Sequence, residues 1–502
     1  LAKRIRRASH MPPTKTNQHR RTISPVKTHR AASRNDDSST LVEPDIFDPN
    51  VSGYEGYYVL DACDEIQGPY DARQLRGWLE SGYLHPQVFV RHGGDKHGHF
   101  FPLGVFERPL HRIVCQGLDE WPVHDHDIAS GVLNDYRSWD FNIWDLEPYE
   151  LAPLSMLLMS SLGLSESFNI DATKWRTFML KVSSLMTCHG NPYHNYYHIS
   201  DVAQTCFVLL TRFEASDLFL SHEILSLMVS SFVHDLDHPG MNNNYQVNKG
   251  TELAIRYNDA SVLENHHCSL AFEVINSPEC GILDGLDYST RRSVRKLMIN
   301  IILATDMTFH FALQADVTKL ASRDCFRAPT EHPTIPQDTL SMELADEERV
   351  TLLKVVLHVS DISNSAKAWN ISKKWSDLVC DEFFQQGERE KAEGLPVSPS
   401  MDRDTTLQDE LSLNFTDFII APYFFSLTAV LPKLAPVICQ IERNRGRWHE
   451  MLMSRLKRCV VSDEVISKWE KREKLFLTAV GPVVKTAAAK NSADETFSEK
   501  DT

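Results

Sequence analysis

Apolar side chains recur at three- and four-residue spacing through most of residues 130–483. Residues at this spacing share one face of a helix, so the pattern predicts a long, mostly α-helical domain over that range. One run, with Leu225, Met228 and Phe232 on its apolar face, leads directly into His234. The pattern therefore places His234 at the end of a buried helix.

Two later apolar runs, 292–305 and 350–359, are followed by Asp306 and Asp361. Helices that bury an apolar face and present an acid at their ends can line one pocket. The most apolar run, 418–438, is interrupted by three prolines and a lysine. This composition predicts buried helices broken by loops, and no transmembrane span.

Outside the helical region the pattern changes. A stretch at 53–105 is rich in β-forming residues and predicts a small second domain, followed by a linker at 106–129. Residues 1–50 are rich in Arg, Ser, Thr and Pro and cannot bury enough apolar surface to offset the entropy of folding. We expect a disordered basic arm there and a disordered tail at 484–502.

The charge of the chain is unevenly distributed. Its 502 residues have a formal net charge of −16, but the first 34 carry ten Lys and Arg and no acid, which leaves a net charge of −26 on the remainder. An acidic body argues against nucleic acid as the main partner. The ten cysteines are scattered without close pairs and no signal peptide is recognised, so we expect reduced thiols and a cytoplasmic protein.

Two histidine and aspartate clusters point to metal chemistry. His194 and His198 form the first, and the second begins about forty residues later with His234 and Asp235. In a helix, residues four apart share a face, so His194 and His198 are expected to reach one centre. His234 and Asp235 add a nitrogen and an oxygen ligand, a mixture that zinc and a harder neighbouring ion accept. With the distal Asp361, the clusters predict a two-metal site.

Two-metal sites hydrolyse phosphate esters, because the ions neutralise the phosphoryl oxygens and lower the pKa of a bridging water. The leaving oxygen then needs a proton. A histidine just outside the metal shell suits this role, since its unperturbed pKa is about 6.5.

In this order, the motifs resemble the catalytic domain of class I cyclic nucleotide phosphodiesterases over about 350 residues. The matching positions are Tyr193, His194, Asn195, His198 and Asp201; His234, Asp235, Asp237, His238, Pro239 and Gly240; Tyr257, Asn258 and Asp259; 261–267; Thr305, Asp306, Met307 and His310; His358, Asp361, Ser363 and Asn364; 382–387; Ser398 and Pro399; and Phe415 and Asp417. The resemblance implies an all-helical metal-dependent phosphohydrolase of the HD type, which hydrolyses a cyclic nucleotide to its 5′-monophosphate through a metal-bridged hydroxide.

The resemblance implies that four residues hold the first metal, normally Zn²⁺: His198, His234, Asp235 and Asp361. Asp235 would also bridge to a second ion, normally Mg²⁺ or Mn²⁺, which keeps most of its waters. His194 would be the general acid, and Glu264 and His238 would orient the imidazole and the hydroxide. The alternative for Glu264 is an ordinary solvated or helix-pairing carboxylate.

The resemblance also implies that five residues bind the substrate: Tyr193, Asn364, Val379, Ser412 and Phe415. Val379 and Phe415 would clamp the two faces of the purine, although apolar residues at such spacing also occur as plain core. The family has a glutamine three residues before this phenylalanine, where the chain has Ser412. Gln408, one helical turn earlier, could substitute only if the local path of the chain differs. Asn364 matches a position that faces adenine in relatives selective for cyclic AMP, so cyclic AMP is favoured, with cyclic GMP as the alternative.

The segment at 53–105 resembles a GYF domain, a small α+β module that binds proline-rich peptides. The signature consists of Tyr58, Gln67, Gly68, Pro69, Tyr70, Leu75, Trp78, Gly82, Tyr83 and Leu84. The resemblance implies that four aromatic residues bind the peptide: Tyr58, Tyr70, Trp78 and Tyr83. Such side chains make flat walls on which a polyproline helix stacks with little entropy to lose. The alternative is that they only form the core of a small fold.

In the basic arm, the sequence Arg6, Arg7, Ala8, Ser9 looks like a target of the cyclic-AMP-dependent kinase, and a kinase acting at Ser9 is a candidate partner. The alternative is a plain solvated tail. For the whole chain, the alternative to an enzyme is a scaffold or nucleotide-sensing protein with a degenerate pocket, acting through the GYF-like domain. The complete metal set favours the enzyme, and Ser412 keeps the alternative open.

Overall fold

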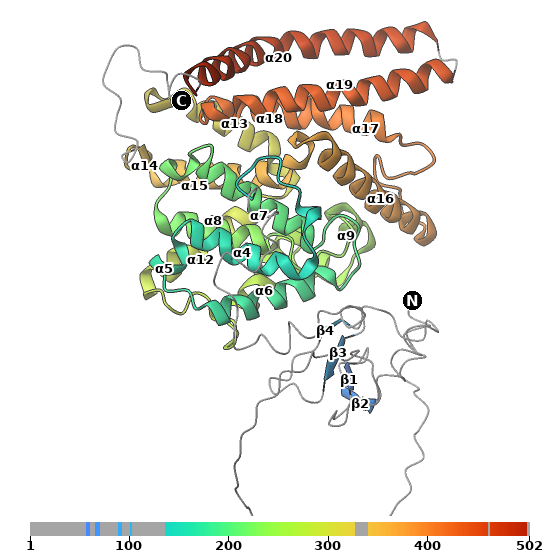
Figure 1. Cartoon of the computed structure of the whole chain (residues 1–502). Coiled ribbons are helices and arrows are strands. Elements are labelled where there is room, and N and C mark those ends of the chain that lie inside the picture. Colours follow the sequence, from blue (N-terminus) through green and yellow to red (C-terminus); the bar gives the residue numbers. More distant parts are fainter. Residues whose placement is uncertain are drawn as a thin grey trace, which may run out of the picture. The chain divides into compact units, whose positions relative to one another are not determined.

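The computed structural model describes strands at 57–60, 66–70, 89–92 and 101–102, and the segments 136–326, 340–459 and 462–498, with side chains described in these segments as far as residue 482. The chain divides into two compact units, Leu1–His124 and Asp125–Thr502 (Figure 1). This division falls inside the linker predicted at 106–129. The predicted basic arm, with Ser9, lies outside the described residues.

The N-terminal unit contains an antiparallel sheet with strand order β2-β1-β3-β4. The strands are β1 (Tyr57–Leu60), β2 (Ile66–Tyr70), β3 (Phe89–His92) and β4 (Phe101–Pro102). Aromatic and β-branched residues dominate β1 and β3, as expected for strands. Tyr58 lies in β1 and Tyr70 ends β2, whereas Trp78 and Tyr83 lie outside the described residues.

The described part of the C-terminal unit is helical, as predicted. Its α-helices are α4 (Leu151–Ser161), α5 (Leu164–Ser167), α6 (Ala172–Thr187), α7 (Tyr196–Thr211), α8 (Ser221–Val233), α9 (Asn243–Lys249), α10 (Glu252–Arg256), α11 (Val262–Ile275), α12 (Tyr288–Leu303), α13 (His310–Leu320), α14 (Leu340–Glu343), α15 (Asp346–Asp361), α16 (Trp369–Glu393), α17 (Gln408–Phe415), α18 (Ala421–Thr428), α19 (Ala435–Arg458) and α20 (Asp463–Ser498). Short 3₁₀ segments lie at Ile143–Asp145, Pro148–Glu150, Ala215–Leu218, Met307–Phe309, Asp324–Phe326, Ser363–Ala366 and Pro432–Leu434, and a π-helical segment lies at Thr416–Ile420.

The centre of this unit is formed by α7, α8, α12 and α15, which contact one another. Each contributes apolar side chains that are completely buried, among them Leu209, Leu227, Ile301 and Leu357. Burial of these faces stabilises the helices more than intrinsic propensity does. At the end of α8, His234 is the capping residue and is completely buried, which confirms the predicted position of His234.

The apolar run at 418–438 is divided among the π-helical segment, α18, a 3₁₀ turn and the start of α19, as the prolines predicted. Beyond it, α19 and α20 lie side by side (Figure 1). The backbone of α20 stays helical to Ser498, which differs from the disordered tail expected at 484–502. A run of three alanines at 487–489, the residues with the highest helix propensity, favours this continuation.

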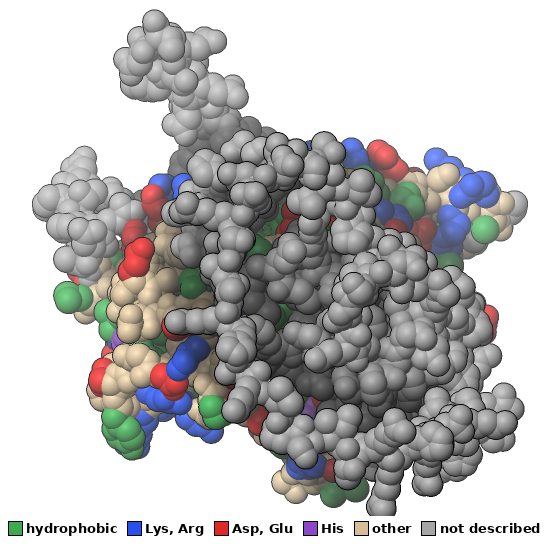
Figure 2. Space-filling view, turned by 60° about the horizontal axis from the view of Figure 1, so that its bottom comes forward, with side chains coloured by type: hydrophobic (Ala, Val, Ile, Leu, Met, Phe, Trp, Pro, Cys, Tyr) green, Lys and Arg blue, Asp and Glu red, His purple; other side chains and the backbone are tan. Residues whose placement is uncertain are grey.

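Two surface properties bear on partners. No single helix within the described segments is long and apolar enough to cross a membrane; α12 and the segment Met307–Leu320, bent by 81°, reach that length and composition only as a pair. Figure 2 shows basic and acidic side chains interspersed over the described part of one face.

Candidate active site

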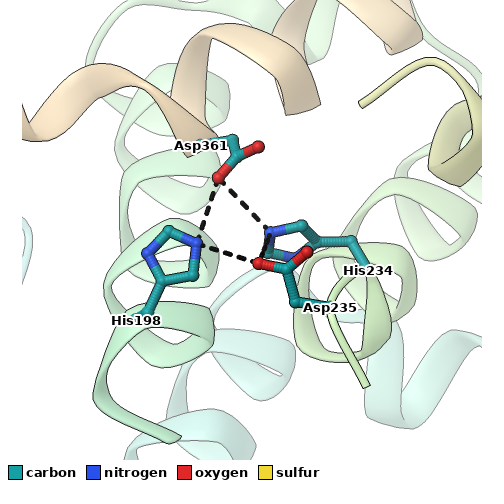
Figure 3. Close-up of side chains that lie close together, drawn as sticks. All are labelled: His198, His234, Asp235 and Asp361. Carbon is teal, nitrogen blue, oxygen red and sulfur yellow. Dashed lines mark ion pairs between the residues drawn. The ribbon is translucent and has the colours of Figure 1, made fainter. Parts of the chain in front are cut away.

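Four side chains, here called the metal cluster, meet at one point: His198, His234, Asp235 and Asp361 (Figure 3). His198 lies in the first turn of α7, the adjacent His234 and Asp235 follow α8, and Asp361 ends α15. Nε2 of His198 lies 3.2 Å from Oδ2 of Asp235 and 3.0 Å from Oδ1 of Asp361. Nε2 of His234 lies 3.4 Å and 3.5 Å from the same two oxygens. The structure thus brings together the four residues expected to hold the first metal.

The donor atoms of the metal cluster fit a dication. Nε2 of His198 and Nε2 of His234 are buried and receive no hydrogen bond from any described residue. The other ring nitrogen of His234, Nδ1, donates to the carbonyl oxygen of Ser231 at 3.0 Å, which leaves the Nε2 lone pair available to a cation. Two imidazole nitrogens and two carboxylate oxygens form a donor set that Zn²⁺ accepts in tetrahedral geometry.

The carboxylates of the metal cluster control the protonation of its histidines. Burial lowers the pKa of His198, but Asp235 and Asp361 outweigh burial and raise it to about 9. The same balance raises the pKa of His234 to about 9. Burial raises the pKa of each aspartate, yet the histidines hold both values below the ordinary range. Without an ion, both carboxylates are therefore ionised and paired with protonated imidazoles near neutral pH, and a cation that binds would displace the two imidazole protons.

His194 does not share a helix with His198. Asn195 has an extended backbone, with φ −141° and ψ −175°, and its side chain accepts hydrogen bonds from the backbone N–H groups of Tyr197 and His198. This cap starts α7 at Tyr196, so the prediction that helical spacing brings both imidazoles to one centre is wrong. The two rings are 5.5 Å apart at 80°. Nε2 of His194 instead lies 3.9 Å from Oδ2 of Asp235, beside the metal cluster.

Glu382 of α16 holds His194 in place. Its Oε2 accepts hydrogen bonds from the backbone N–H groups of Tyr193 and His194 at 2.9 Å and 3.0 Å, and its Oε1 pairs with Nδ1 of the His194 ring. Burial lowers the pKa of His194, but Glu382 outweighs burial and raises it. Burial raises the pKa of Glu382, while His194 lowers it to a net value of about 2. The pair therefore favours the protonated form of the imidazole next to the metal cluster.

His238 packs against the free face of His194. The two rings are stacked, with centroids 3.8 Å apart and an angle of 21°. Nδ1 of His238 accepts a hydrogen bond from the backbone N–H of Gly240 at 3.0 Å, which places the ring proton on Nε2. Burial and the charge of His194 hold the pKa of His238 well below its usual value. The neutral His238 ring thus fixes the plane of the His194 ring and places no second positive charge beside it.

Two residues of α11, Glu264 and His267, lie near the metal cluster. Nε2 of His267 lies 3.8 Å from Oδ1 of Asp235, the oxygen that does not face His198. The Glu264 carboxylate accepts hydrogen bonds from Nδ2 of Asn243 at 2.9 Å and 3.2 Å, and burial raises its pKa to about 7. Although Glu264 was expected to orient the His194 imidazole, Glu382 makes that contact.

The polar residues expected around the base lie in two hydrogen-bonded groups. Nδ2 of Asn364 donates to the hydroxyl oxygen of Tyr193 at 2.6 Å. Oγ of Ser412 lies 3.1 Å from Oγ of Ser376, and Nε2 of Gln408 donates to that same Ser376 oxygen at 3.0 Å. Gln408 also donates to Oδ1 of Asp377 at 2.7 Å. On the regular helix α17, Gln408 therefore stays one turn from Ser412 and is linked to it through Ser376.

The apolar pair expected to clamp the purine lies on neighbouring helices. Val379 belongs to α16 and Phe415 ends α17, and these two helices contact each other. Both side chains are partly buried, so neither belongs to the fully closed core.

Sequence reasoning assigned no role to Glu382 or His267, although both lie in matched motifs. Glu382 contacts His194 across 188 residues of sequence. The local spacing of apolar and polar residues cannot predict a contact between residues so far apart in the sequence. The buried face of α16 also carries Gln386 and Glu390, so an acidic residue at 382 gave no distinct signal in the sequence.

Comparisons with known proteins identify the family of the chain. A profile of the 3′5′-cyclic nucleotide phosphodiesterase family matches residues 193–441, and a GYF domain profile matches 57–103. The crystal structure of the phosphodiesterase domain of the RhoPDE fusion protein from the choanoflagellate Salpingoeca rosetta aligns with a TM-score of 0.58 and 30% identity, covering 64% of this chain and 97% of that one. The chain thus belongs to the cyclic nucleotide phosphodiesterase family. It combines a catalytic domain of that family with an N-terminal GYF domain.

Two curated relatives differ in the nucleotide that their names specify. Human high affinity cGMP-specific 3′,5′-cyclic phosphodiesterase 9A is 36% identical over 292 residues, which are 58% of this chain and 46% of that protein. The probable 3′,5′-cyclic-AMP phosphodiesterase pde-4 of Caenorhabditis elegans is 31% identical over 294 residues, which are 58% of this chain and 42% of that protein. The chain spans less than half the length of either relative.

Proposed function

We propose that this chain hydrolyses a cyclic nucleotide to its 5′-monophosphate. The observation that carries the proposal is the position of the Glu382–His194 pair, which places Nε2 of the imidazole 3.9 Å from a carboxylate oxygen of the metal cluster. A leaving oxygen on a phosphate bound at the metal cluster would then lie within reach of a proton donor. The family match over 193–441 supports this assignment.

Each residue has a distinct part in the proposed reaction. Dications at the metal cluster, Zn²⁺ and Mg²⁺ or Mn²⁺ in our proposal, would neutralise phosphate oxygens and lower the pKa of water. After the attacking water has lost one proton to solvent, its oxygen bonds to phosphorus as the bond to the 3′ oxygen breaks, and His194 gives its Nε2 proton to that leaving oxygen. Glu382 keeps the His194 ring aimed and protonated before transfer, and His238 holds its plane. Proton transfer leaves a neutral His194 that still donates from Nδ1 to Glu382.

Cyclic AMP is the proposed preferred substrate. Nδ2 of Asn364 donates one of its two protons to Tyr193, and its Oδ1, which accepts from Ser365 at 3.4 Å, has a second lone pair for a base. An acceptor suits the exocyclic amine of adenine better than the exocyclic oxygen of guanine. Ser412, in place of a glutamine, offers one hydroxyl rather than a two-point amide, so discrimination between the bases should be modest.

Hydrolysis can be tested directly with the purified full chain, cyclic AMP, cyclic GMP and added Mg²⁺. We expect turnover of both nucleotides, with cyclic AMP preferred, and loss of turnover in Asp361→Ala. Asp404→Ala, which changes an exposed aspartate paired only at the surface with Lys391, serves as the matched control and should keep activity. Nucleotide binding without any hydrolysis by the wild type would favour the alternative, a nucleotide-sensing scaffold.

For the GYF domain we propose binding of a proline-rich peptide. The domain match at 57–103 and the aromatic residues Tyr58, Tyr70, Trp78 and Tyr83 support this proposal. Fluorescence anisotropy of a labelled proline-rich peptide, titrated with the full chain, should show binding that Trp78→Ala removes. Trp369→Ala, a substitution in α16 of the catalytic domain, is the control and should leave peptide affinity unchanged. Equal binding by the wild type and Trp78→Ala would refute the assigned site.

A further inference from the structure

A third group of potential metal ligands lies beside the active site. Cys188 caps the C-terminal end of α6, His189 follows it, and Asp237 lies in the turn after α8. Their ligand atoms all lie within 4.8 Å of one another. Among residues 136–326, 340–459 and 462–482, the other groups of this kind are the metal cluster and the group of His194, His238 and Glu382. Cys188, His189 and Asp237, here called the thiol cluster, have no part in the proposed hydrolysis.

The separations within the thiol cluster approach those of a coordination sphere. Sγ of Cys188 lies 3.4 Å from Oδ1 of Asp237, and Nε2 of His189 lies 2.8 Å from the same oxygen. In a tetrahedral Zn²⁺ site with ordinary bond lengths, sulfur and oxygen ligands are about 3.6 Å apart, and nitrogen and oxygen ligands about 3.4 Å apart. The His189 contact would thus open by about 0.6 Å. The His189 side chain is 39% exposed, so it is free to make this movement.

His266 of α11 supports the shared carboxylate from its other side. Nε2 of His266 lies 2.8 Å from Oδ2 of Asp237, while Oδ1 faces Cys188 and His189. A partner of this kind fixes the orientation of a ligating carboxylate. Asp237 also has a positive φ of 63°, a conformation that aspartate tolerates better than most residues and that recurs at functional sites.

We propose that the thiol cluster binds a transition-metal dication of the Zn²⁺ class, with Cys188, His189 and Asp237 as ligands and water in the fourth position. Binding breaks the S–H bond of Cys188, forms a metal–sulfur bond and releases the proton to solvent. The sulfur donor selects Zn²⁺ or Co²⁺ over Mg²⁺ or Ca²⁺, which prefer oxygen. Exposure of Cys188 and His189 gives the ion an entry path.

An ion bound at the thiol cluster would connect two segments of the active site. Residues 188–194 lead from α6 to His194, and Asn191 already ties this segment to the turn after α8 by donating to the carbonyl oxygens of His194 and His238. An ion held by Cys188, His189 and Asp237 would join the same two segments a second time. Since it binds only the folded chain, it would also stabilise the folded state.

The absorption spectrum of bound Co²⁺ distinguishes the thiol cluster from the metal cluster. A thiolate bound to Co²⁺ gives a near-ultraviolet charge-transfer band, which the nitrogen and oxygen ligands of the metal cluster cannot produce. Titrating the reduced, metal-free full chain with Co²⁺ should therefore produce this band in the wild type. Cys188→Ser should abolish it, and His266→Ala should weaken Co²⁺ affinity by about 10- to 100-fold. Cys459→Ser, a change at another exposed cysteine, is the matched control and should keep the band.

The outcome of the Co²⁺ titration does not depend on whether the chain hydrolyses a cyclic nucleotide. Asp361→Ala, which disrupts the metal cluster, should keep the charge-transfer band even if its activity is lost. In thermal unfolding, added Zn²⁺ should raise the midpoint of the wild type more than that of Cys188→Ser. A wild type without the band, or a band of equal size in Cys188→Ser, would show that these residues form only a hydrogen-bonded network and would overturn the proposal.

Discussion

Replacing Glu382 with glutamine tests the general-acid arrangement most directly. The carboxylate accepts hydrogen bonds from three N–H groups, two in the backbone of Tyr193 and His194 and one on the His194 ring. A glutamine amide has one acceptor oxygen, and its NH₂ group would face N–H donors. The change therefore removes the negative charge beside His194 and leaves at least one donor without a partner.

The expected loss follows from these contacts. A hydrogen bond to a charged group contributes about 1.5–3 kcal/mol, which corresponds to about 10- to 150-fold in kcat if the imidazole loses its alignment. The charge of Glu382 raises the pKa of His194, so its removal lowers that pKa. Because a general acid must be protonated to act, activity falls as the pH rises through its pKa. The alkaline limb of the pH–rate profile should therefore move to lower pH in Glu382→Gln.

The assay is the pH dependence of kcat and kcat/KM for cyclic AMP in the wild type, Glu382→Gln and a control. Glu388→Gln is the matched control, since Glu388 lies on the same helix but pairs with Arg403 at the surface. Its rate should stay within about twofold of the wild type, as expected for an exposed ion pair. An unchanged kcat and an unmoved alkaline limb in Glu382→Gln would refute the reasoning, because the carboxylate would then contribute neither charge nor alignment.

Three further substitutions probe the metal cluster, the base pocket and the core. Asp361→Ala should lower bound zinc and abolish hydrolysis, whereas His194→Ala should retain zinc while turnover falls about 100-fold or more. Metal analysis and kinetics on both variants measure these effects. Full activity with an unchanged metal content in Asp361→Ala would contradict the assigned site. Ser412→Gln should sharpen discrimination between cyclic AMP and cyclic GMP, by about 2- to 12-fold in kcat/KM for each contact worth 0.5–1.5 kcal/mol. If the wild type already discriminates by more than about 100-fold and the glutamine changes nothing, the base is read elsewhere, with Gln408 as the first candidate. Lys367→Met should lower the free energy of unfolding by about 3–5 kcal/mol in urea denaturation, because Lys367 is completely buried 2.6 Å from Asp201 and its loss leaves an unpaired buried charge. Lys391→Met, at an exposed pair with Asp402, should cost less than about 1 kcal/mol, and an equal cost for both would contradict this account.

Local patterns in the sequence determined the helical architecture and indicated a metal site. The spacing of apolar residues predicted the helix that ends at His234. Apolar residues that recur every three or four positions share one helix face, and this face packs against the core. The broken run at 418–438 followed from its prolines, which cannot continue a helix. Chemistry and spacing pointed to a metal site but grouped His194 with His198, and the resemblance to a known family implied the set His198, His234, Asp235 and Asp361.

Tertiary structure decided which of these residues lie together in the metal cluster and which lie beside it. The extended backbone of Asn195 starts α7 at Tyr196 and separates His194 from His198, although their spacing alone predicted a shared face. Glu382 reaches His194 only because α16 packs against the start of α7, and this contact raises the pKa of His194. The thiol cluster likewise joins Cys188 and Asp237 across 49 residues. Contacts between distant segments depend on how the helices pack as a whole, and a periodicity that is local along the chain carries no information about them.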